Sequence, residues 1–289
     1  MMSQPVGLIG LGAMGGSMAA RLLETGHEVV GYDALPEARE RAARVGAVIA
    51  DHPAAVAKAV DVLILSLPKA QFVDDVMSDV GPHLCKGAVV LDTTTSEPET
   101  SRAHETKGAA HGYAFLDAPV SGGPAAARSG AMTMIVGGDG AALEKAKPVL
   151  KDLTSKLLHI GPSGAGNVAK IANNLLCAAN LALVSEMVHL AARAEVSAAD
   201  LLAGVNAGSG RSGVSEVNFP RWILNGSYDS GFTMGLMRKD IGLARDLADK
   251  FGLDLPAMKA IADIWEESRD RLSDSADFNE IFKYEKSHD

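Results

Sequence analysis

A glycine pattern near the start of the chain, Gly10-Leu11-Gly12-Ala13-Met14-Gly15, sharply limits the choice of fold. It directly follows the apolar run VGLI and opens a segment from Met14 to Thr25 that is typical of a helix. In such a turn the first glycine permits a tight bend, the second lets the backbone approach a pyrophosphate, and the third lets helix and strand pack closely. A plain strand-to-helix turn is the alternative, since a chain with 30 glycines produces such patterns by chance. Its context favours a dinucleotide site made of Gly10, Leu11, Gly12, Ala13, Met14 and Gly15.

A carboxylate at the end of the second apolar run indicates which dinucleotide is bound. Asp33 lies 18 residues after Gly15, near the spacing expected for a residue that accepts hydrogen bonds from the adenosine ribose. A carboxylate at this point repels a 2′-phosphate, and the next residues, Ala34 and Leu35, are uncharged. The nearest arginine is Arg39. The sequence therefore predicts that NAD is preferred over NADP.

Short β-type runs alternate with helical segments over the first part of the chain. The β-type runs VGLIG, HEVVGYD, DVLILSLP and AVVLD are separated by helical segments, and YAFLDAPV, AMTMIVGG and KLLHIG extend the series to about Ile160. This alternation predicts a parallel sheet wrapped by helices, an α/β Rossmann-type, doubly wound domain. Gly26 is placed to end the first helix, and Ser96-Glu97-Pro98-Glu99 has the pattern of a capping box at the start of a later one.

The composition changes after the Gly/Pro/Ser stretch at residues 161–164. From Ala165 to about Ala194 few helix-breaking residues occur, which predicts a helix of roughly 30 residues, about 45 Å long. Shorter helical segments follow it to the end of the chain. We therefore predict two domains, an NAD-binding Rossmann-type domain over residues 1–163 and an all-α substrate and oligomerisation domain over residues 164–289.

Charge and cysteine content exclude several other classes of protein. The net charge of −9 and the pI near 5.4 argue against binding to nucleic acid, because phosphate backbones are held by excess Lys and Arg. Cys85 and Cys177 form no CxxC pair, so they predict neither a disulfide framework nor a zinc site, and a reduced, cytoplasmic compartment is expected. The apolar segment from Ile171 to Val184 contains three asparagines and stops at Glu186, which favours a buried helix over a membrane span.

Two kinds of catalysis find no support in the residues. The eight histidines form no HExxH pattern and no cluster with cysteine, so no metal site is predicted. A Gly-x-Ser-x-Gly turn between strand and helix, which a nucleophilic hydrolase of the α/β type needs, is absent from the sequence.

Four separated segments, GLIGLGAMGGSMAARL, DAPVSGGPAAARSG, GAGNVAKIANN and FTMGLMRKD, occur in this order along the chain. In these the chain resembles the β-hydroxyacid dehydrogenase family, which includes 3-hydroxyisobutyrate dehydrogenase and tartronate semialdehyde reductase. The resemblance covers nearly the whole chain. It implies a Rossmann-type domain, an all-α domain joined by a long interdomain helix, an active site in the cleft between them, and a small hydroxy-carboxylic acid or its semialdehyde as substrate.

Lys170 is the residue for which chemistry and resemblance agree. Oxidation of a hydroxy acid needs one ionisable side chain near the substrate oxygen to take the hydroxyl proton. Lys170 lies in a mostly uncharged helical segment, where desolvation disfavours the ammonium form, and the resemblance implies that it is the catalytic general acid and base. A surface lysine is the alternative. Asn174 lies one helical turn later on the same face, which predicts a second substrate contact, whereas Asn173 points elsewhere.

The resemblance assigns further contacts at the ends of strands and on a later helix. It implies that Ser121, Gly122 and Gly123 bind the substrate carboxylate, although Gly-Gly before Pro124 is also typical of a simple turn. Thr95 follows the AVVLD run, and Leu67 and Pro68 end the VLILSLP run, where a doubly wound sheet binds its ligand. We expect these three residues and Lys239 to contact the cofactor, and Leu67 also fits a core position.

One departure from the family pattern and two rival functions stay open. Arg211 is followed by Ser212-Gly213, where 3-hydroxyisobutyrate dehydrogenases tend to have Cys-Trp, so the individual substrate is not predicted. An imine or semialdehyde reductase of the same architecture is the nearest alternative, and a non-catalytic NAD-binding protein the next. Imine reductases usually replace the lysine, and Lys170 and Asn174 are both present here. The long apolar helix and the family resemblance predict a homodimer or homotetramer.

Overall fold

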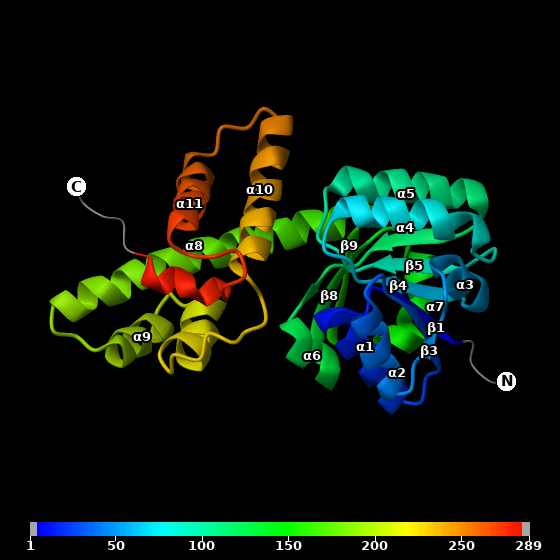
Figure 1. Cartoon of the computed structure of the whole chain (residues 1–289). Coiled ribbons are helices and arrows are strands. Elements are labelled where there is room, and N and C mark those ends of the chain that lie inside the picture. Colours follow the sequence, from blue (N-terminus) through cyan, green and yellow to red (C-terminus); the bar gives the residue numbers. More distant parts are fainter. Residues whose placement is uncertain (1–4, 285–289) are drawn as a thin grey trace. The chain divides into compact units, whose positions relative to one another are not determined.

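The computed structural model describes residues 5–284, which form two compact units (Figure 1). The first unit ends at Lys170 and the second begins at Ile171. Each unit has its own buried core, and the two are described separately.

A nine-stranded sheet forms the centre of the first unit. The strands lie in the order β3 (Val48–Ile49), β2 (Val29–Tyr32), β1 (Val6–Ile9), β4 (Val62–Leu65), β5 (Val89–Asp92), β6 (Ala114–Asp117), β8 (Met132–Gly137) and β7 (Val120–Ser121), with β9 (Thr154–Gly161) paired to β8. The first six are parallel and have the 3-2-1-4-5-6 order of a doubly wound dinucleotide-binding sheet, which confirms the predicted fold class. The later strands differ from the prediction, because β8 is antiparallel to both β6 and β7.

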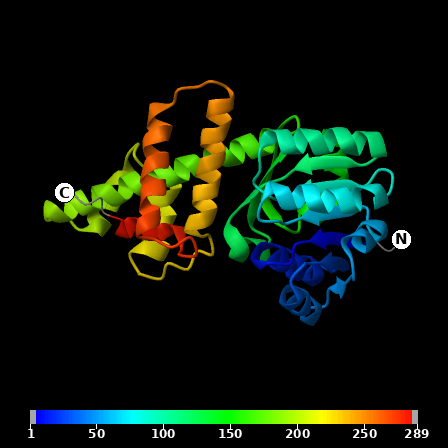
Figure 2. The same ribbon diagram turned by 45° about the horizontal axis from the view of Figure 1, so that its top comes forward.

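Helices cover both faces of this sheet. They are α1 (Ala13–Glu24), α2 (Pro36–Arg44), α3 (Pro53–Ala59), α4 (Ala70–Val80), α5 (Pro98–His111), α6 (Gly123–Ser129) and α7 (Gly140–Leu150), with a short 3-10 turn η1 (Gly81–His83). Figures 1 and 2 show α4 and α5 side by side on one face, whereas α1 and α2 lie on the other. Because both faces are covered, the central strands are continuous apolar runs up to their carboxyl ends, where β5 and β6 end in Asp92 and Asp117, and do not alternate with polar residues.

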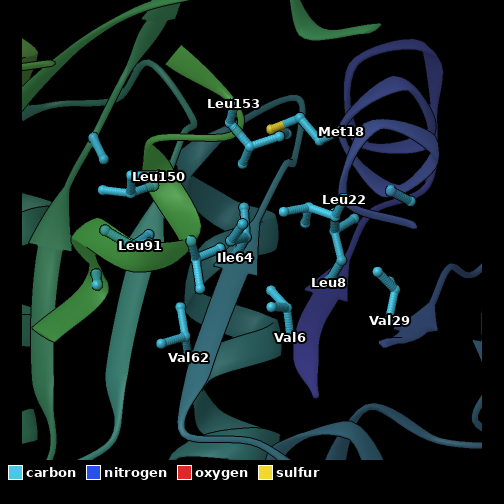
Figure 3. Close-up of a cluster of buried hydrophobic side chains, with 14 of the residues drawn as sticks. Val6, Leu8, Met18, Leu22, Val29, Val62, Ile64, Leu91, Leu150 and Leu153 are labelled. Atoms are coloured by element: carbon cyan, nitrogen blue, oxygen red, sulfur yellow. The ribbon is translucent and has the colours of Figure 1, made fainter. Parts of the chain in front are cut away.

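Successive side chains along each strand point to opposite faces of the sheet, so they belong to two different cores. On β4, Val62 and Ile64 belong to one cluster and Leu63 and Leu65 to the other. Figure 3 shows the first cluster, in which Ile64 and neighbouring strand residues meet side chains of α1 and α7. The second cluster packs α3 and α4 against the opposite face. This packing fixes the carboxyl ends of β1, β4 and β5 in one row, and the candidate cofactor residues follow those ends.

Three local features differ from the sequence prediction. The short elements β3 and α3 were not predicted, because a two-residue strand and a seven-residue helix are too short to show a hydrophobic period. The predicted capping box is wrong: α5 begins at Pro98 with Glu97 as its N-cap, and no side chain caps it. Ser96 instead exchanges hydrogen bonds with Asn167, since its N–H donates to the amide oxygen and its hydroxyl accepts from the amide nitrogen.

The second unit is helical, as predicted. The long helix α8 (Ala165–Arg193) leads into α9 (Ala198–Ala207), the π-helix η2 (Val214–Ile223), α10 (Met234–Lys250), α11 (Pro256–Glu267) and the 3-10 segments η3 (Ser268–Asp270) and η4 (Phe278–Lys283). Its core surrounds the fully buried side chains of Phe219 and Trp265. The indole N–H of Trp265 donates to the carbonyl of Ala178, which ties α11 to α8.

Helix α8 is less buried than its apolar sequence suggests. By length and composition alone it is apolar enough to cross a membrane, a test that core helices of other proteins also pass, yet only 33% of its most apolar window is buried. The stripe Ala178, Leu181, Ser185 and Val188 packs inward. The predicted burial of this helix therefore holds for one side only, because the opposite side exposes Leu176, Leu183, Met187 and Leu190.

Candidate active site

The glycine turn between β1 and α1 is tightly packed at two of its glycines and open at the third. Gly10 has φ +92°, and a Cβ there would lie 2.2 Å from the carbonyl oxygen of Ser66. A Cβ on Gly15 would lie 1.8 Å from the carbonyl oxygen of Gly10. Gly12 is exposed, and a Cβ there would have no atom within 4 Å. The turn therefore leaves its open side at Gly12, where a ligand can approach the backbone.

The N-terminus of α1 fits an anionic group. Gly12 is the N-cap residue and no side chain caps the helix, while Ala13 beside it is exposed. Free N–H groups at a helix start, together with the helix dipole, bind phosphate. Leu11 and Met14 differ from the other four motif residues, since the Leu11 side chain is buried in the core of the sheet and the half-buried Met14 side chain packs against that core.

Asp33 directly follows β2 and joins the glycine turn. Its Oδ2 accepts the N–H of Leu11 at 2.6 Å, and its Oδ1 accepts the N–H of Leu35 at 2.8 Å. Arg39 lies beside it, because its guanidinium donates to the carbonyl oxygens of Asp33 and Ala34. These bonds fix the carboxylate next to the turn, and each oxygen retains a lone pair for a ribose hydroxyl.

The remaining cofactor candidates of the first unit follow β4 and β5. Leu67 lies beside the turn, because a Cβ on Gly10 would be 3.2 Å from its Cδ2. The N–H of Leu67 donates to the hydroxyl of Thr94 at 3.3 Å, which joins the two strand ends. Pro68 is exposed and Thr95 half-buried. Both strand ends therefore border the open side of the sheet, at the β1/β4 switch point where this fold binds its ligand.

Lys170 and Ser121 are in contact. The Lys170 amine donates to the Ser121 hydroxyl at 2.9 Å, and Lys170 is only 8% exposed. Ser121 ends β7, and the two residues after it, Gly122 and Gly123, have φ values of +118° and +68°. A side chain at Gly122 would also collide with Ala126 at 2.5 Å. Glycine is therefore required in this turn, and its backbone N–H groups are not shielded by side chains.

Two buried polar residues near Lys170 were not singled out from the sequence. Asp117, at the end of β6, accepts backbone N–H groups from Gly164 and Asn167, and Asn167 is itself fully buried. A sequence signal existed for both. Asp117 is the only charge in the apolar run YAFLDAPV, and Asn167 lies one turn before Lys170.

In the second unit a carboxylate on α10 holds two of the predicted residues. The Asn174 amide nitrogen donates to Asp240 Oδ2, and the ammonium group of Lys239 lies 3.0 Å from Asp240 Oδ1. Asn173 donates to the oxygen of the Asn174 amide at 3.0 Å, so it braces its neighbour. Asp240 is 2% exposed and was not predicted as a site residue. This arrangement leaves the second N–H of the Asn174 amide as its free donor.

Phe232, in the segment FTMGLMRKD, and Arg211 lie apart from these contacts. Phe232 packs edge-on against Phe278 with ring centroids 5.3 Å apart, and Arg211 is exposed in the loop after α9. Among residues 5–284 no group of three or more His, Cys, Asp or Glu side chains is arranged to hold a metal ion.

Comparison with known proteins covers both units. Residues 5–161 match the NAD binding domain of 6-phosphogluconate dehydrogenase, and residues 164–284 match the NAD-binding domain of NADP-dependent 3-hydroxyisobutyrate dehydrogenase. The chain is 34% identical to 2-(hydroxymethyl)glutarate dehydrogenase of Eubacterium barkeri over 91% of this chain and 89% of that enzyme. It is 35% identical to NAD-dependent L-serine dehydrogenase of Pseudomonas aeruginosa over 87% of each chain.

A solved structure agrees with these relatives. The 3-hydroxyisobutyrate dehydrogenase of Mycobacterium tuberculosis, solved with L-serine, superposes with a TM-score of 0.92 at 30% identity, over 98% of this chain and 99% of that one. The chain thus belongs to the 3-hydroxyisobutyrate dehydrogenase family of β-hydroxyacid dehydrogenases, NAD(P)-dependent enzymes that act on CH–OH groups.

Proposed function

We propose that this enzyme uses NAD to oxidise a 3-hydroxypropanoate substituted at carbon 2 to the corresponding semialdehyde, with Lys170 as general acid and base. The observation that carries the proposal is the buried Lys170 amine, 2.9 Å from the hydroxyl of Ser121 and next to an open glycine turn. A buried amine at hydrogen-bonding distance from a hydroxyl has the geometry that proton transfer needs.

The chemistry assigned to Lys170 is the transfer of one proton. In the oxidation, the neutral amine takes the proton from the substrate hydroxyl as the C–H bond breaks, and in the reduction the ammonium returns it to the aldehyde oxygen. The nicotinamide ring, when bound, accepts the hydride from the carbon. The Ser121 hydroxyl keeps the amine in place through its hydrogen bond. Burial keeps bulk water from competing for the proton.

The substrate carboxylate is assigned to Ser121, Gly122 and Gly123. A hydroxyl and two unshielded backbone N–H groups suit an anion without requiring a second cation beside Lys170. Asn174, one helical turn after Lys170 on α8, supplies a further donor for the substrate. Its amide orientation is fixed by Asp240 and Asn173, so the free N–H is preorganised.

The substrate class is inferred from the chemistry that three relatives share. 3-Hydroxyisobutyrate, L-serine and 2-(hydroxymethyl)glutarate, the compounds in their names, are all HO–CH₂–CHR–COO⁻ and differ only in R. Lys170 and the glycine turn can recognise the shared hydroxyl and carboxylate, whereas R has to be recognised elsewhere. We therefore propose that the substrate of this enzyme has the form HO–CH₂–CHR–COO⁻. The identity of R is the quantity that a substrate panel measures.

NAD is assigned as the cofactor in preference to NADP because of Asp33. Its carboxylate is held in place by the N–H groups of Leu11 and Leu35, so it cannot easily turn away from a 2′-phosphate. The side chain of Arg39 is engaged with backbone carbonyls on the same loop. Repulsion between the carboxylate and the phosphate favours NAD.

A homodimer or homotetramer is proposed from the exposed side of α8. Leu176, Leu183, Met187 and Leu190 follow one another at intervals of seven, four and three residues, which places them on one face of the helix. A second copy of the same helix can cover this self-complementary stripe. Light scattering on the wild type and on Leu183→Glu tests this, since a wild type with the mass of one chain would refute it.

The test of the enzymatic proposal is a panel of 2-substituted 3-hydroxypropanoates and their semialdehydes, with 2-hydroxy acids and cyclic imines as comparison compounds, assayed by NADH and NADPH absorbance with NAD(H) and NADP(H). We expect turnover with at least one member and a higher kcat/KM with NAD. Turnover only with 2-hydroxy acids or imines would refute the assigned substrate class.

A further inference from the structure

We infer that Asp117 is a positioning residue that sets the direction of Lys170 by holding the first turn of α8. The inference rests on the assignment of Lys170 as general acid and base. Asp117 is fully buried at the end of β6, and its two carboxylate oxygens accept different N–H groups of the helix start. Oδ1 accepts from Gly164 at 2.7 Å, and Oδ2 accepts from Asn167 at 3.0 Å.

This arrangement replaces an ordinary N-cap. Gly164 immediately precedes α8 and has no side chain to cap it, so a carboxylate from the sheet binds two of the N–H groups that a helix start leaves free. A negative charge at this end is also favoured by the dipole of a 29-residue helix. The helix start is thereby attached to the sheet by a fully buried group.

The surrounding glycines show how closely the helix start approaches Asp117. A Cβ on Gly166, in the first turn of α8, would lie 2.8 Å from Asp117 Oδ2, and a Cβ on Gly137 in β8 would lie 2.7 Å from the same atom. Neither residue therefore has room for any side chain. The Asp117 carboxylate therefore packs directly against the backbone of these two glycines. It cannot move without losing its hydrogen bonds to the N–H groups at the helix start.

A second buried group fixes the rotation of the helix. Asn167 is fully buried, and its amide oxygen accepts the N–H of Ser96 at 3.2 Å while its nitrogen donates to the hydroxyl of Ser101 at 2.9 Å. Its backbone N–H is the one held by Asp117. Asn167 is thus fixed through both its main chain and its side chain, to β6 on one side and to the start of α5 on the other.

Fixing Asn167 determines where Lys170 points. Three residues along a helix correspond to a rise of about 4.5 Å and a rotation of about 300°. The chain segment from Asp117 to Ser121 therefore holds α8 at two positions. The Asp117 carboxylate accepts the N–H of Asn167, and the Ser121 hydroxyl accepts a hydrogen bond from the Lys170 amine. The distance between the Lys170 amine and the glycine turn that follows Ser121 depends on both hydrogen bonds.

Asp117→Asn tests the inference with little change in volume. An amide has only one oxygen, so its NH₂ group faces one of the two helix N–H donors and that hydrogen bond is lost. A misplacement near 1 Å can cost about 100-fold in rate, so we expect kcat to fall between about 10-fold and 100-fold while KM for NAD changes less than about twofold. The solvent deuterium isotope effect on kcat should rise, since proton transfer to Lys170 becomes slower.

Asp139→Asn is the matched control. Asp139 is also an aspartate N-cap in the first unit, accepting the N–H of Ala142 at 2.7 Å at the start of α7, but it is exposed and contacts no site residue. Because asparagine caps a helix about as well as aspartate, this variant should leave both the stability and the isotope effect nearly unchanged. Ser101→Ala, which removes the hydroxyl acceptor of the Asn167 amide, is the second variant should Asp117→Asn not fold, and we expect a smaller fall in kcat from it.

Hydrogen exchange of residues 164–170 separates this inference from the proposed function. Rates are expressed per NADH-binding site, so that a loss of folded protein does not mimic a loss of kcat. An unchanged isotope effect in Asp117→Asn, or exchange over residues 164–170 no faster than in Asp139→Asn, would overturn the positioning role. A wild type inactive on the whole panel would instead overturn the proposed function, and the exchange measurement would then decide the positioning role alone.

Discussion

Replacing Lys170 by alanine is the most direct perturbation of the proposed chemistry. Lys170 is 8% exposed and its amine lies 2.9 Å from the Ser121 hydroxyl, so bulk water is a poor substitute for it in proton transfer. General acid and base catalysis contributes between about 100-fold and 10,000-fold to a rate. We therefore expect kcat to fall about 1,000-fold, which corresponds to about 4 kcal/mol of activation free energy.

The loss should be confined to the chemical step. NADH titration, followed by tryptophan or nicotinamide fluorescence, should give a Kd within about twofold of the wild type, because the glycine turn and Asp33 are untouched. An exogenous primary amine such as methylamine should restore part of the rate in Lys170→Ala, since it fits the space left by the side chain. Lys145→Ala is the control, because the Lys145 amine is exposed and donates only to the carbonyl of Gly87 on the surface.

Stability gives an independent check on Lys170. A buried lysine costs desolvation energy, so Lys170→Met should leave the free energy of unfolding unchanged within about 1 kcal/mol or raise it, even though activity is lost. The reasoning fails if Lys170→Ala keeps more than about a third of the wild-type kcat, or if Lys170→Met unfolds so readily that the activity loss follows the loss of folded protein.

Three further predictions concern the cofactor, the substrate and pH. Asp33→Ser removes the charge facing a 2′-phosphate, so the NADP to NAD ratio of kcat/KM should rise about 100-fold, and an unchanged ratio would contradict the role of Asp33. Asp240→Asn weakens the hold on the Asn174 amide and should raise KM for the hydroxy acid about tenfold with NAD binding little changed, whereas Asp246→Asn on the exposed side of the same helix should have no effect. Burial lowers the pKa of His104 below its usual value near 6.5 more than a hydrogen bond to a neighbouring aspartate raises it. The unfolded chain therefore binds this proton first, so stability should fall as the pH drops below about 6.5, and chemical denaturation of His104→Gln should show a weaker dependence in that range.

Much of the first unit could be predicted from local patterns. The glycine turn, the carboxylate at Asp33 and the apolar runs of β1, β4 and β5 are each recognised from a short segment, and the geometry of each segment is determined locally by the chain. The same holds for Lys170 and Asn174, whose common face follows from the helical period alone. Short elements such as β3 were missed because they are too short to show a hydrophobic period.

The missed polar contacts depend on residues far apart in the chain. Ser96 is 71 residues from Asn167. It was predicted to cap α5 because its neighbours matched a local pattern, but a buried amide competed successfully for its N–H and hydroxyl. When a backbone group can bind either a nearby side chain or a distant one, burial decides which partner it binds. Burial cannot be read from the sequence. Asp117 was missed for the same reason, since its partners lie 47 and 50 residues later.

The sequence by itself determined the type of sheet, the dinucleotide turn and the long helix. These depend on periodicity and on the conformational freedom of glycine, which act over one or two turns of chain. Only the tertiary structure decided which groups hold the candidate site residues in place. The carboxylate of Asp117 reaches the start of α8 within the first unit, and that of Asp240 reaches Asn174 within the second, because the packing inside each unit brings distant segments within hydrogen-bonding distance.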